Sequence, residues 1–532
     1  MRKLLSFLYL SIISSFLVAQ QGNFVVSGQV TDNITKEALI GVNIISNNIG
    51  TSTNIDGNYT LKLPYGNHEI VYKYIGYENI TKKIFINSDS LIKINIQLNS
   101  SSEQLSTVVV SAGKFNQKLE EITVSMEVIK PNLIENKSSS NIETAMEQIP
   151  GLNITDGQAN IRGGSGWSYG AGTRVLVMVD DMPLISGDAG QVQWNLVATE
   201  NINQVEIIKG ASSALYGSSA LNGIINIRTA YPKQSEIDKN PSLGFTKVNL
   251  NFGVIDFAKR KAINWYGDKR RSFKGIEFLQ SLKYENIDIS FGGNIFKDDG
   301  YRQDEKTDRN RFNFNSLFKS DQISGLSYGI NGNFLFESTA SVLIWDGFDR
   351  AYIALNNDVT KTGGDSYNVD PFITYIKGNN RHSLRTRYLK VINDNESRDS
   401  LANLDNRSKS YYSDYQWQKN LKKYNLSFTT GITNEIIFAQ SKAFQGKNFR
   451  RNHSFYSQID KKIGNLNIST GARYEYFSLN SETKHVIGGD TLDHFATGGP
   501  VFRGGLNYQI GESTFIRSSW GQGYRFPSMA EL

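Results

Sequence analysis

The sequence has no cysteine in its 532 residues, which excludes a disulfide framework, a thiolate nucleophile and a cysteine zinc site. Long apolar runs are also missing after residue 20, since none approaches the ~18 residues that a membrane-spanning helix needs. Lysine and arginine are spread along the chain and give a formal charge of +6, without the basic stripe expected for a nucleic-acid partner. What remains is a chain rich in Tyr (26) and Phe (29), residue types that favour strands.

The glycine loops contain no motif of covalent catalysis. The stretch Gly163-Gly164-Ser165-Gly166 is not a nucleophile elbow, because Trp167 stands where the last glycine is needed. No glycine loop is followed by Lys-Ser or Lys-Thr, which excludes a P-loop. Asp180 and Asp181 are adjacent and would point to opposite faces of a strand, so a turn is the better interpretation. We therefore expect neither enzymatic activity nor a cofactor.

Metal-ligating residue types gather in one polar segment, residues 479–497. Imidazole and carboxylate groups suit several divalent ions, but polar residues also crowd surface loops. We interpret His485, Asp490, Asp493 and His494 as solvated residues of an external loop and predict no metal site.

Residues 1–20, MRKLLSFLYLSIISSFLVAQ, predict a secretory signal peptide. Arg2 and Lys3 form its charged start, residues 4–18 its apolar core, and Ala19 is a cleavage position. A membrane anchor is the alternative, although the apolar core is short for a span.

Residues 24–98 alternate apolar and polar side chains with a period of two. Tyr59, Leu61 and Leu63 alternate with polar neighbours, and Asp56-Gly57 is a hairpin-turn signal just before them. Short, evenly spaced strands of this kind predict a β-sandwich of about seven strands.

From residue 243 to residue 532 the alternation continues in runs of about ten residues. Connections are tight in some places, as at Gly464-Asn465, and long and polar in others, as over residues 300–310 and 479–497. This asymmetry is typical of an outer-membrane β-barrel, and the pattern predicts roughly 12 strands. A soluble sandwich is the alternative.

Between these regions, residues 120–129 predict a strand, and residues 140–148 predict a short helix that Ser140 or Asn141 can cap. Short β-rich runs then alternate with glycine-dense loops over residues 149–229. This stretch resembles the plug domain of TonB-dependent outer-membrane receptors, with several independent motifs in the family's order. They are Ile149-Pro150-Gly151, Ile161-Arg162-Gly163, residues 175–183, Val205-Glu206-Ile207-Ile208-Lys209-Gly210, Ser213-Ala214-Leu215-Tyr216-Gly217 and Gly223-Ile224-Ile225-Asn226-Ile227. Residues 24–98 also look like the carboxypeptidase-regulatory-like domain, a non-catalytic sandwich.

The resemblance implies a domain order for the rest of the chain. Residues 99–112 become a linker that carries the Ton box, the segment gripped by the periplasmic protein TonB, and residues 113–231 become the plug. The Ton box falls on Thr107, Val108, Val109, Val110 and Ser111. Such a segment can add itself as a strand to a partner's sheet edge. A plain edge strand is the alternative.

The resemblance also suggests residue roles within the plug. Arg162 and Glu206 stand in the family's plug motifs, and we expect them to be charged contacts between plug and barrel. Trp167 and Tyr169 lie in a loop suited to contacting a ligand, and ordinary loop packing is an equal alternative.

The expected fold is mainly β, with an N-terminal β-sandwich, a small α+β plug domain and a partial transmembrane antiparallel β-barrel. In the resembled receptors a pattern like that of residues 523–532, GYRFPSMAEL, lies inside the barrel. We therefore expect residues 243–532 to be the N-terminal part of an incomplete barrel, in a C-terminally truncated gene or a fragment.

The function implied is that of a receptor in the outer membrane of a Gram-negative bacterium. It would import a scarce substrate, a siderophore, cobalamin, glycan or peptide, at the expense of the proton-motive force. Its partners would be TonB with the inner-membrane energising complex, outer-membrane lipid, the substrate and, as a further candidate, a surface lipoprotein. The rival interpretation is a secreted β-rich adhesion or glycan-binding protein without transport. A secreted hydrolase is weakened by the missing catalytic motif.

Overall fold

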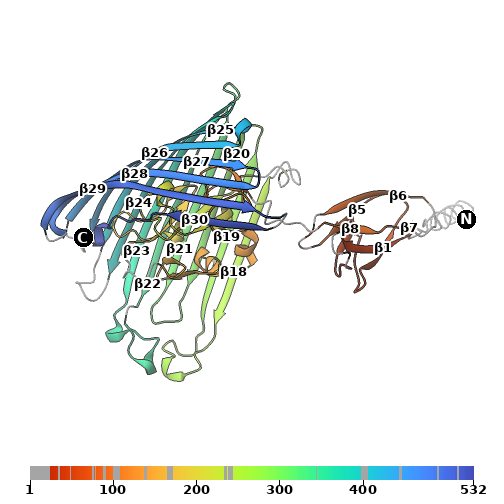
Figure 1. Cartoon of the computed structure of the whole chain (residues 1–532). Coiled ribbons are helices and arrows are strands. Elements are labelled where there is room, and N and C mark those ends of the chain that lie inside the picture. The colour runs from red at the N-terminus through yellow and green to blue at the C-terminus, as the bar shows by residue number, and fades with distance from the viewer. Residues whose placement is uncertain are drawn as a thin grey trace, which may run out of the picture. The chain divides into compact units, whose positions relative to one another are not determined.

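The computed structural model describes residues 24–33, 36, 38–47, 49–74, 77, 79–87, 92–99, 108–136, 141–164, 172–232, 237, 244–342, 344–396, 405–441, 446–487, 490–511 and 514–531. The predicted signal peptide lies outside these residues. The chain divides into two compact units, of which the first ends at Thr107 and the second begins at Val108. Figure 1 shows the elements of both.

The first unit is a sandwich of two sheets. One sheet has the order β4-β1-β7, with β8 also paired to β1, and the other has the order β3-β2-β5-β6. The strands are β1 (Phe24–Asp32), β2 (Asn43–Ser46), β3 (Ile49–Ser52), β4 (Asn58–Leu63), β5 (Gly66–Lys73), β6 (Ile80–Ile86), β7 (Ile92–Lys93) and β8 (Ile96–Leu98). The period-two pattern buries one face of each main strand, as in β4, where Tyr59, Leu61 and Leu63 point inward.

A glycine lets the last strands of the sandwich lie against the first. A Cβ on Gly28 would stand 1.8 Å from the carbonyl oxygen of Ile94 and 3.0 Å from the Tyr59 ring. That carbonyl accepts a hydrogen bond from the Tyr59 hydroxyl at 2.9 Å, and the Ile94 N–H donates to Ser27 at 2.7 Å. Any side chain at position 28 must therefore push backbone away from backbone.

We expect Gly28→Ala to lower the free energy of unfolding of this domain by about 1–3 kcal/mol, the usual cost of overpacking. Urea unfolding of residues 24–107, followed by circular dichroism, measures the change. Gly50→Ala is the matched control, because its Cβ would meet nothing closer than 3.5 Å. Equal stability of the two variants would contradict this role for Gly28.

The second unit begins with the plug, a small α+β domain. Its main sheet has the order β11-β16-β17-β14-β15, and β9-β10 and β12-β13 form two-stranded pairs. The elements are β9 (Val108–Val109), β10 (Gln117–Lys118), β11 (Met126–Ile129), α2 (Pro131–Asn136), α3 (Ile142–Met146), β12 (Leu152–Thr155), β13 (Gln158–Ile161), β14 (Val175–Val179), β15 (Met182–Pro183), η1 (Trp194–Leu196), η2 (Thr199–Asn201), β16 (Ile202–Lys209), α4 (Ser213–Tyr216) and β17 (Gly223–Thr229).

Two local predictions for the plug have different outcomes. The helix predicted near residues 140–148 is α3, and the Asn141 side chain caps it by accepting a hydrogen bond from the Glu143 N–H at 2.8 Å. The strand predicted from Glu120 to Ile129 is shorter, because β11 begins only at Met126. Residues 120 and 122 offer their carbonyls to the Asn507 side chain at 2.6 and 2.9 Å instead of to a neighbouring strand.

A single antiparallel sheet of 13 strands follows, with each strand hydrogen-bonded to the next along the chain. Its strands are β18 (Phe245–Ile255), β19 (Arg271–Lys283), β20 (Ile287–Asp298), β21 (Thr307–Lys319), β22 (Leu326–Ser341), β23 (Thr360–Lys377), β24 (Asn380–Glu396), β25 (Asn406–Leu421), β26 (Leu426–Ser441), β27 (Gly446–Ile463), β28 (Leu466–Ile487), β29 (Asp490–Gln509) and β30 (Phe515–Gly521). The remaining short 3₁₀ turns are η3 (Lys261–Ile263), η4 (Phe348–Arg350), η5 (Leu355–Asn357), η7 (Lys422–Tyr424) and η8 (Met529–Glu531).

From β18 to β25 the connections alternate between long and short. The tight turn predicted at Gly464-Asn465 joins β27 to β28. The prediction of a long external loop over residues 479–497 is wrong, because β28 continues to Ile487 and β29 starts at Asp490. The polar side chains there hid the strands, since both faces of a strand that extends beyond a membrane can be solvated.

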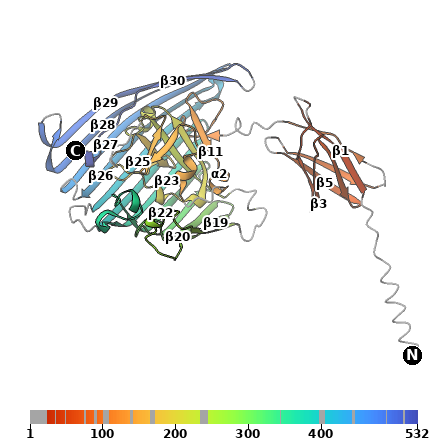
Figure 2. The ribbon, with the colours of Figure 1, turned by 90° about the horizontal axis from the view of Figure 1, so that it is seen from below.

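The sheet curves around the plug, which lies on its concave side (Figure 2). On the opposite face the apolar residues stand exposed, as in β18, where Leu250 and Phe252 are 76% and 74% exposed. Buried charged residues such as Arg311, Arg387 and Asp414 lie on the concave side. Apolar outside and polar inside is the pattern of a membrane barrel, so the predicted fold class is confirmed. No helix among the described residues is long and apolar enough to cross a membrane.

Candidate functional site

The segment predicted to be the Ton box is docked onto the plug. Val108 and Val109 form β9, which pairs with Lys118 and Gln117 of β10. Val109 is fully buried in the plug core, whereas Val108 is 48% exposed. Thr107 lies outside the described residues.

A buried carboxylate on β16 clamps the backbone of this segment. The N–H of Val110 donates to both Glu206 oxygens at 3.1 Å, and the N–H of Ser111 donates to one of them at 2.6 Å. Hydrogen bonds to a charged acceptor are stronger than neutral ones. Ser111 is held twice more, because its carbonyl accepts from the Tyr216 hydroxyl at 2.9 Å and its Oγ accepts from Asn226 at 2.8 Å.

The clamp continues into a buried ion pair. Arg228 donates to both oxygens of Asp181 at 2.7 Å, and its Nε lies 3.8 Å from Glu206. Burial by itself would raise the pKa of Asp181, but the charges of Arg228 and Arg385 override it and hold the pKa well below its usual range. Burial, followed by the charge of Asp181, raises the pKa of the Tyr216 phenol. Asp181 and Arg228 therefore stay charged and Tyr216 stays protonated at neutral pH.

Lys114 ties the same segment to the 13-stranded sheet β18–β30, which is called the wall below. Its Nζ lies 2.7 Å from Asp414 of β25, and both side chains are almost fully buried. The ammonium also stands 4.9 Å and 4.3 Å from the ring centroids of Tyr216 and Tyr456, within the range of cation–π attraction. One residue thus connects the segment, the plug and the wall.

The two charged residues expected to hold plug to barrel contact the plug itself. Arg162 donates to the Ser125 hydroxyl at 2.9 Å. The partners of Glu206 described above are likewise plug residues, because its side chain points to the face of β16 that residues 110 and 111 cover. The contacts described for these two side chains therefore lie inside the plug.

Charged side chains of the sheet contact the plug at several points. Arg387 of β24 pairs with Asp370 and donates to the carbonyls of Met182 and Pro183 at 2.9 and 3.0 Å. Arg311 of β21 pairs with Glu200 of the plug, with both side chains buried. The sequence shows that Arg387 and Arg311 stand at alternate, inward-facing strand positions. It does not show which residues are their partners.

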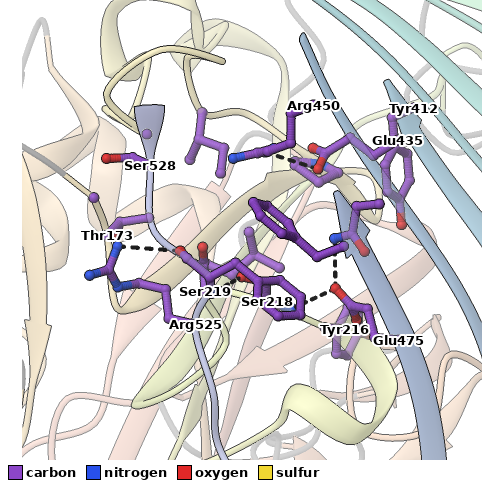
Figure 3. Close-up of a pocket in the computed structure, with 18 of the residues that line it drawn as sticks. Thr173, Tyr216, Ser218, Ser219, Tyr412, Glu435, Arg450, Glu475, Arg525 and Ser528 are labelled. Carbon is purple, nitrogen blue, oxygen red and sulfur yellow. Dashed lines mark hydrogen bonds and ion pairs between the residues drawn. The ribbon is translucent and has the colours of Figure 1, made fainter. Parts of the chain in front are cut away.

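A small polar cavity lies where the plug, the wall and residues 525–528 meet (Figure 3). On its sheet side, Arg450 of β27 pairs with Glu435 of β26 at 3.0 Å, and Asn452 donates to Glu475 at 2.6 Å. Its volume is about 50 Å³, enough for water and far below the ~300 Å³ of a small-molecule site. We assign this cavity to the interface between plug and wall and not to a ligand.

The remaining predicted positions give no further site. Trp167 and Tyr169 lie outside the described residues, as do the side chains of His485 and Asp490. His494 stands on β29 and shares a hydrogen bond of 2.6 Å with Asn480. Within the described residues no group of three or more histidine and acidic side chains is placed to hold a metal ion.

Three segments of the sequence, which together cover most of the chain, match known domain families. Residues 26–110 match the CarboxypepD_reg-like domain, residues 118–224 the TonB-dependent receptor plug domain, and residues 246–532 the TonB dependent receptor-like β-barrel. The chain belongs to the TonB-dependent receptor family.

Individual relatives agree with this membership. The vitamin B12 transporter BtuB of Vibrio vulnificus (strain CMCP6) is 25% identical over 80% of this chain, and TonB-dependent receptor SusC of Bacteroides thetaiotaomicron is 30% identical over 46%. The chain spans 64% of the BtuB sequence and 25% of SusC. The siderophore receptor PiuA from Acinetobacter baumannii shares the fold, with a TM-score of 0.60 and 13% identity over 81% of this chain and 68% of that one.

We expect Glu206→Gln to speed amide exchange at Val110 and Ser111 at least tenfold. A bond to a charged acceptor contributes about 1.5–3 kcal/mol, and glutamine cannot accept from both N–H groups with a full charge. Hydrogen exchange read by mass spectrometry measures the change.

Glu127→Gln is the matched control, since it removes a carboxylate from neighbouring β11 whose partner is Lys209 at 2.5 Å. It should leave exchange at residues 110 and 111 unchanged. Unchanged exchange in Glu206→Gln would mean that Glu206 does not clamp the segment.

Proposed function

We propose that this protein is a TonB-dependent receptor of a Gram-negative outer membrane that imports a scarce substrate without covalent chemistry. The observation that carries the proposal is the docked segment at residues 108–111. It begins where the second unit begins, and its contacts lead directly to β16 and β17 in the middle of the plug sheet. A pull on this segment would therefore act first on the plug.

The first step of such a pull is breaking the Glu206 clamp. β9 has only two residues, so few ladder hydrogen bonds resist its removal. Once Val110 and Ser111 leave, the buried Glu206 carboxylate keeps only Gln204 and the more distant Arg228 among its described partners. A buried charge that loses its hydrogen bonds is unfavourable, so undocking of the segment favours rearrangement of the plug around it.

The partner that pulls is TonB, driven by the inner-membrane energising complex. Strand addition between TonB and residues 107–111 requires free backbone N–H groups along the segment. Outer-membrane lipid surrounds the exposed apolar face of the sheet. A surface lipoprotein is a further proposed partner, and nucleic acid has no part in this function.

The substrate belongs to one of four classes: cobalamin, siderophore, glycan or peptide. Cobalamin is the first to test, because a relative that aligns with 80% of this chain is a vitamin B12 transporter, and a siderophore is the second, because of the fold shared with PiuA.

We expect Val108→Pro to abolish energised uptake and to leave surface binding of the ligand intact. Proline removes a backbone donor and fixes φ. Val108 is the better site than Val109, because Val109 is fully buried and proline there would also disturb the plug core. Cells that express the receptor are assayed for labelled cyanocobalamin and a ferric siderophore, with and without a protonophore.

Val108→Thr is the control for this variant, because it keeps the β-branched shape and the N–H group. It should take up ligand normally. Normal, protonophore-sensitive uptake by Val108→Pro would rule out coupling through this segment.

A further inference from the structure

A continuous row of aromatic side chains runs along the outward face of five neighbouring strands, β23 to β27. It consists of Tyr367, Tyr388, Tyr411, Phe438 and Phe449, with successive ring centroids 5.8, 5.0, 6.4 and 4.7 Å apart. Figure 1 shows β24 to β28 side by side in the sheet. In membrane barrels such a girdle marks the level of the lipid headgroups.

Strand parity places the row on the lipid side. Arg387 points inward to the plug carbonyls, so Tyr388 next to it points outward. Ser408 points inward as well, since its hydroxyl accepts a hydrogen bond from Gly187 of the plug at 3.2 Å. Its neighbour Lys409 and, two residues on, Tyr411 are therefore outward.

Cationic side chains stand just beyond this row, towards the end of the sheet with the long connections. Lys390 follows Tyr388 by two residues, Lys409 precedes Tyr411 by two, and Lys447 precedes Phe449 by two. The three lysines help to line one groove of about 810 Å³ with the rings of Tyr411, Phe438 and Phe449. A basic rim thus borders an aromatic floor.

Among the described residues, no carboxylate forms an ion pair with Lys390 or Lys409 of this groove. Lys390 and Lys409 lie directly opposite each other in register, an arrangement that destabilises a sheet by itself. Among the described residues, the one carboxylate that lines the groove is that of Glu482, which accepts a hydrogen bond from the backbone N–H of Lys447 at 3.0 Å. Arg407, the fourth cation of the lining, pairs with Asp394 at 3.3 Å. An anion between Lys390 and Lys409 would remove the repulsion.

We propose that this groove binds the phosphate-bearing headgroup of an outer-leaflet glycolipid, with the acyl chains extending past the aromatic row along the exposed apolar residues of the same face. The proposal rests on the outer-membrane location proposed above. Charge selects the phosphate, and the aromatic row at headgroup level, with exposed apolar residues on the same face, selects an amphiphile over a free anion. The substrate route lies on the concave side with the plug, so this face is not part of it.

The test uses the purified receptor in detergent and a bis-phosphorylated, hexa-acylated lipid A, with binding counted by native mass spectrometry. Replacing Lys390, Lys409 and Lys447 together by Gln should weaken binding at least tenfold. Lipid A without its phosphates should bind the unchanged receptor at least tenfold more weakly than the phosphorylated form.

Lys423→Gln is the matched control, because Lys423 also stands over an aromatic ring, that of Tyr424 at 5.7 Å, but at the end with the short turns. It should bind lipid A as the unchanged receptor does. The single variant Lys409→Gln, with heat-modifiable mobility as the check of folding, keeps the test valid if the triple variant fails to fold.

Equal binding by the lysine variants and the unchanged receptor, or equal binding of lipid A without phosphates, would overturn the proposal. The assay contains neither TonB nor a transported substrate. Loss of lipid binding and loss of uptake are therefore separate outcomes.

Discussion

The structure depends on one constraint: charged side chains buried on the inward face of the sheet need partners, which the plug and neighbouring strands supply. Buried arginines show it best. Arg387 would be a costly unpaired charge without Asp370 and the carbonyls of Met182 and Pro183. Arg311 depends in the same way on Glu200. Because these bonds go to specific backbone groups, the wall fixes the conformation of the plug loops, and the plug in turn neutralises the wall.

The same constraint limits how the plug can respond to force. Moving the whole plug would break many charged contacts at once, each with a buried partner left behind. Moving residues 108–111 breaks a short strand and the bonds to Glu206, Tyr216 and Asn226. The Lys114–Asp414 pair stands next along the chain and anchors the segment to the wall. Force on the N-terminal side of the plug therefore reaches the Glu206 clamp first and the Lys114–Asp414 pair next. Only afterwards does it reach the other contacts between plug and wall.

Sequence patterns were sufficient for the architecture but not for the partners of charged residues. Period-two alternation and the plug motifs predicted the sandwich, the plug and the barrel-like sheet, because burial of one strand face is a local property. The role of Glu206 depends on which segment covers its face of β16, and that segment lies 95 residues away at Ser111. Lys114 carries no local signal, since its partner Asp414 is 300 residues distant. The extension of β28 and β29 was hidden because the criterion for a strand was apolar alternation, and that pattern is absent where no core or lipid faces the strand.

The register of the strands sets which side chains face the plug and, at the same time, which face the membrane. On β25 the inward residues include Ser408 and Asp414, and the outward ones include Lys409 and Tyr411. A slip of one residue would turn Asp414 into the lipid and Lys409 towards the plug, because side chains alternate with a period of two. The buried bond from Lys114 to Asp414 opposes that slip, since it can form only when Asp414 points inward. The contact that anchors the plug therefore also sets which lysines and aromatic rings face the membrane.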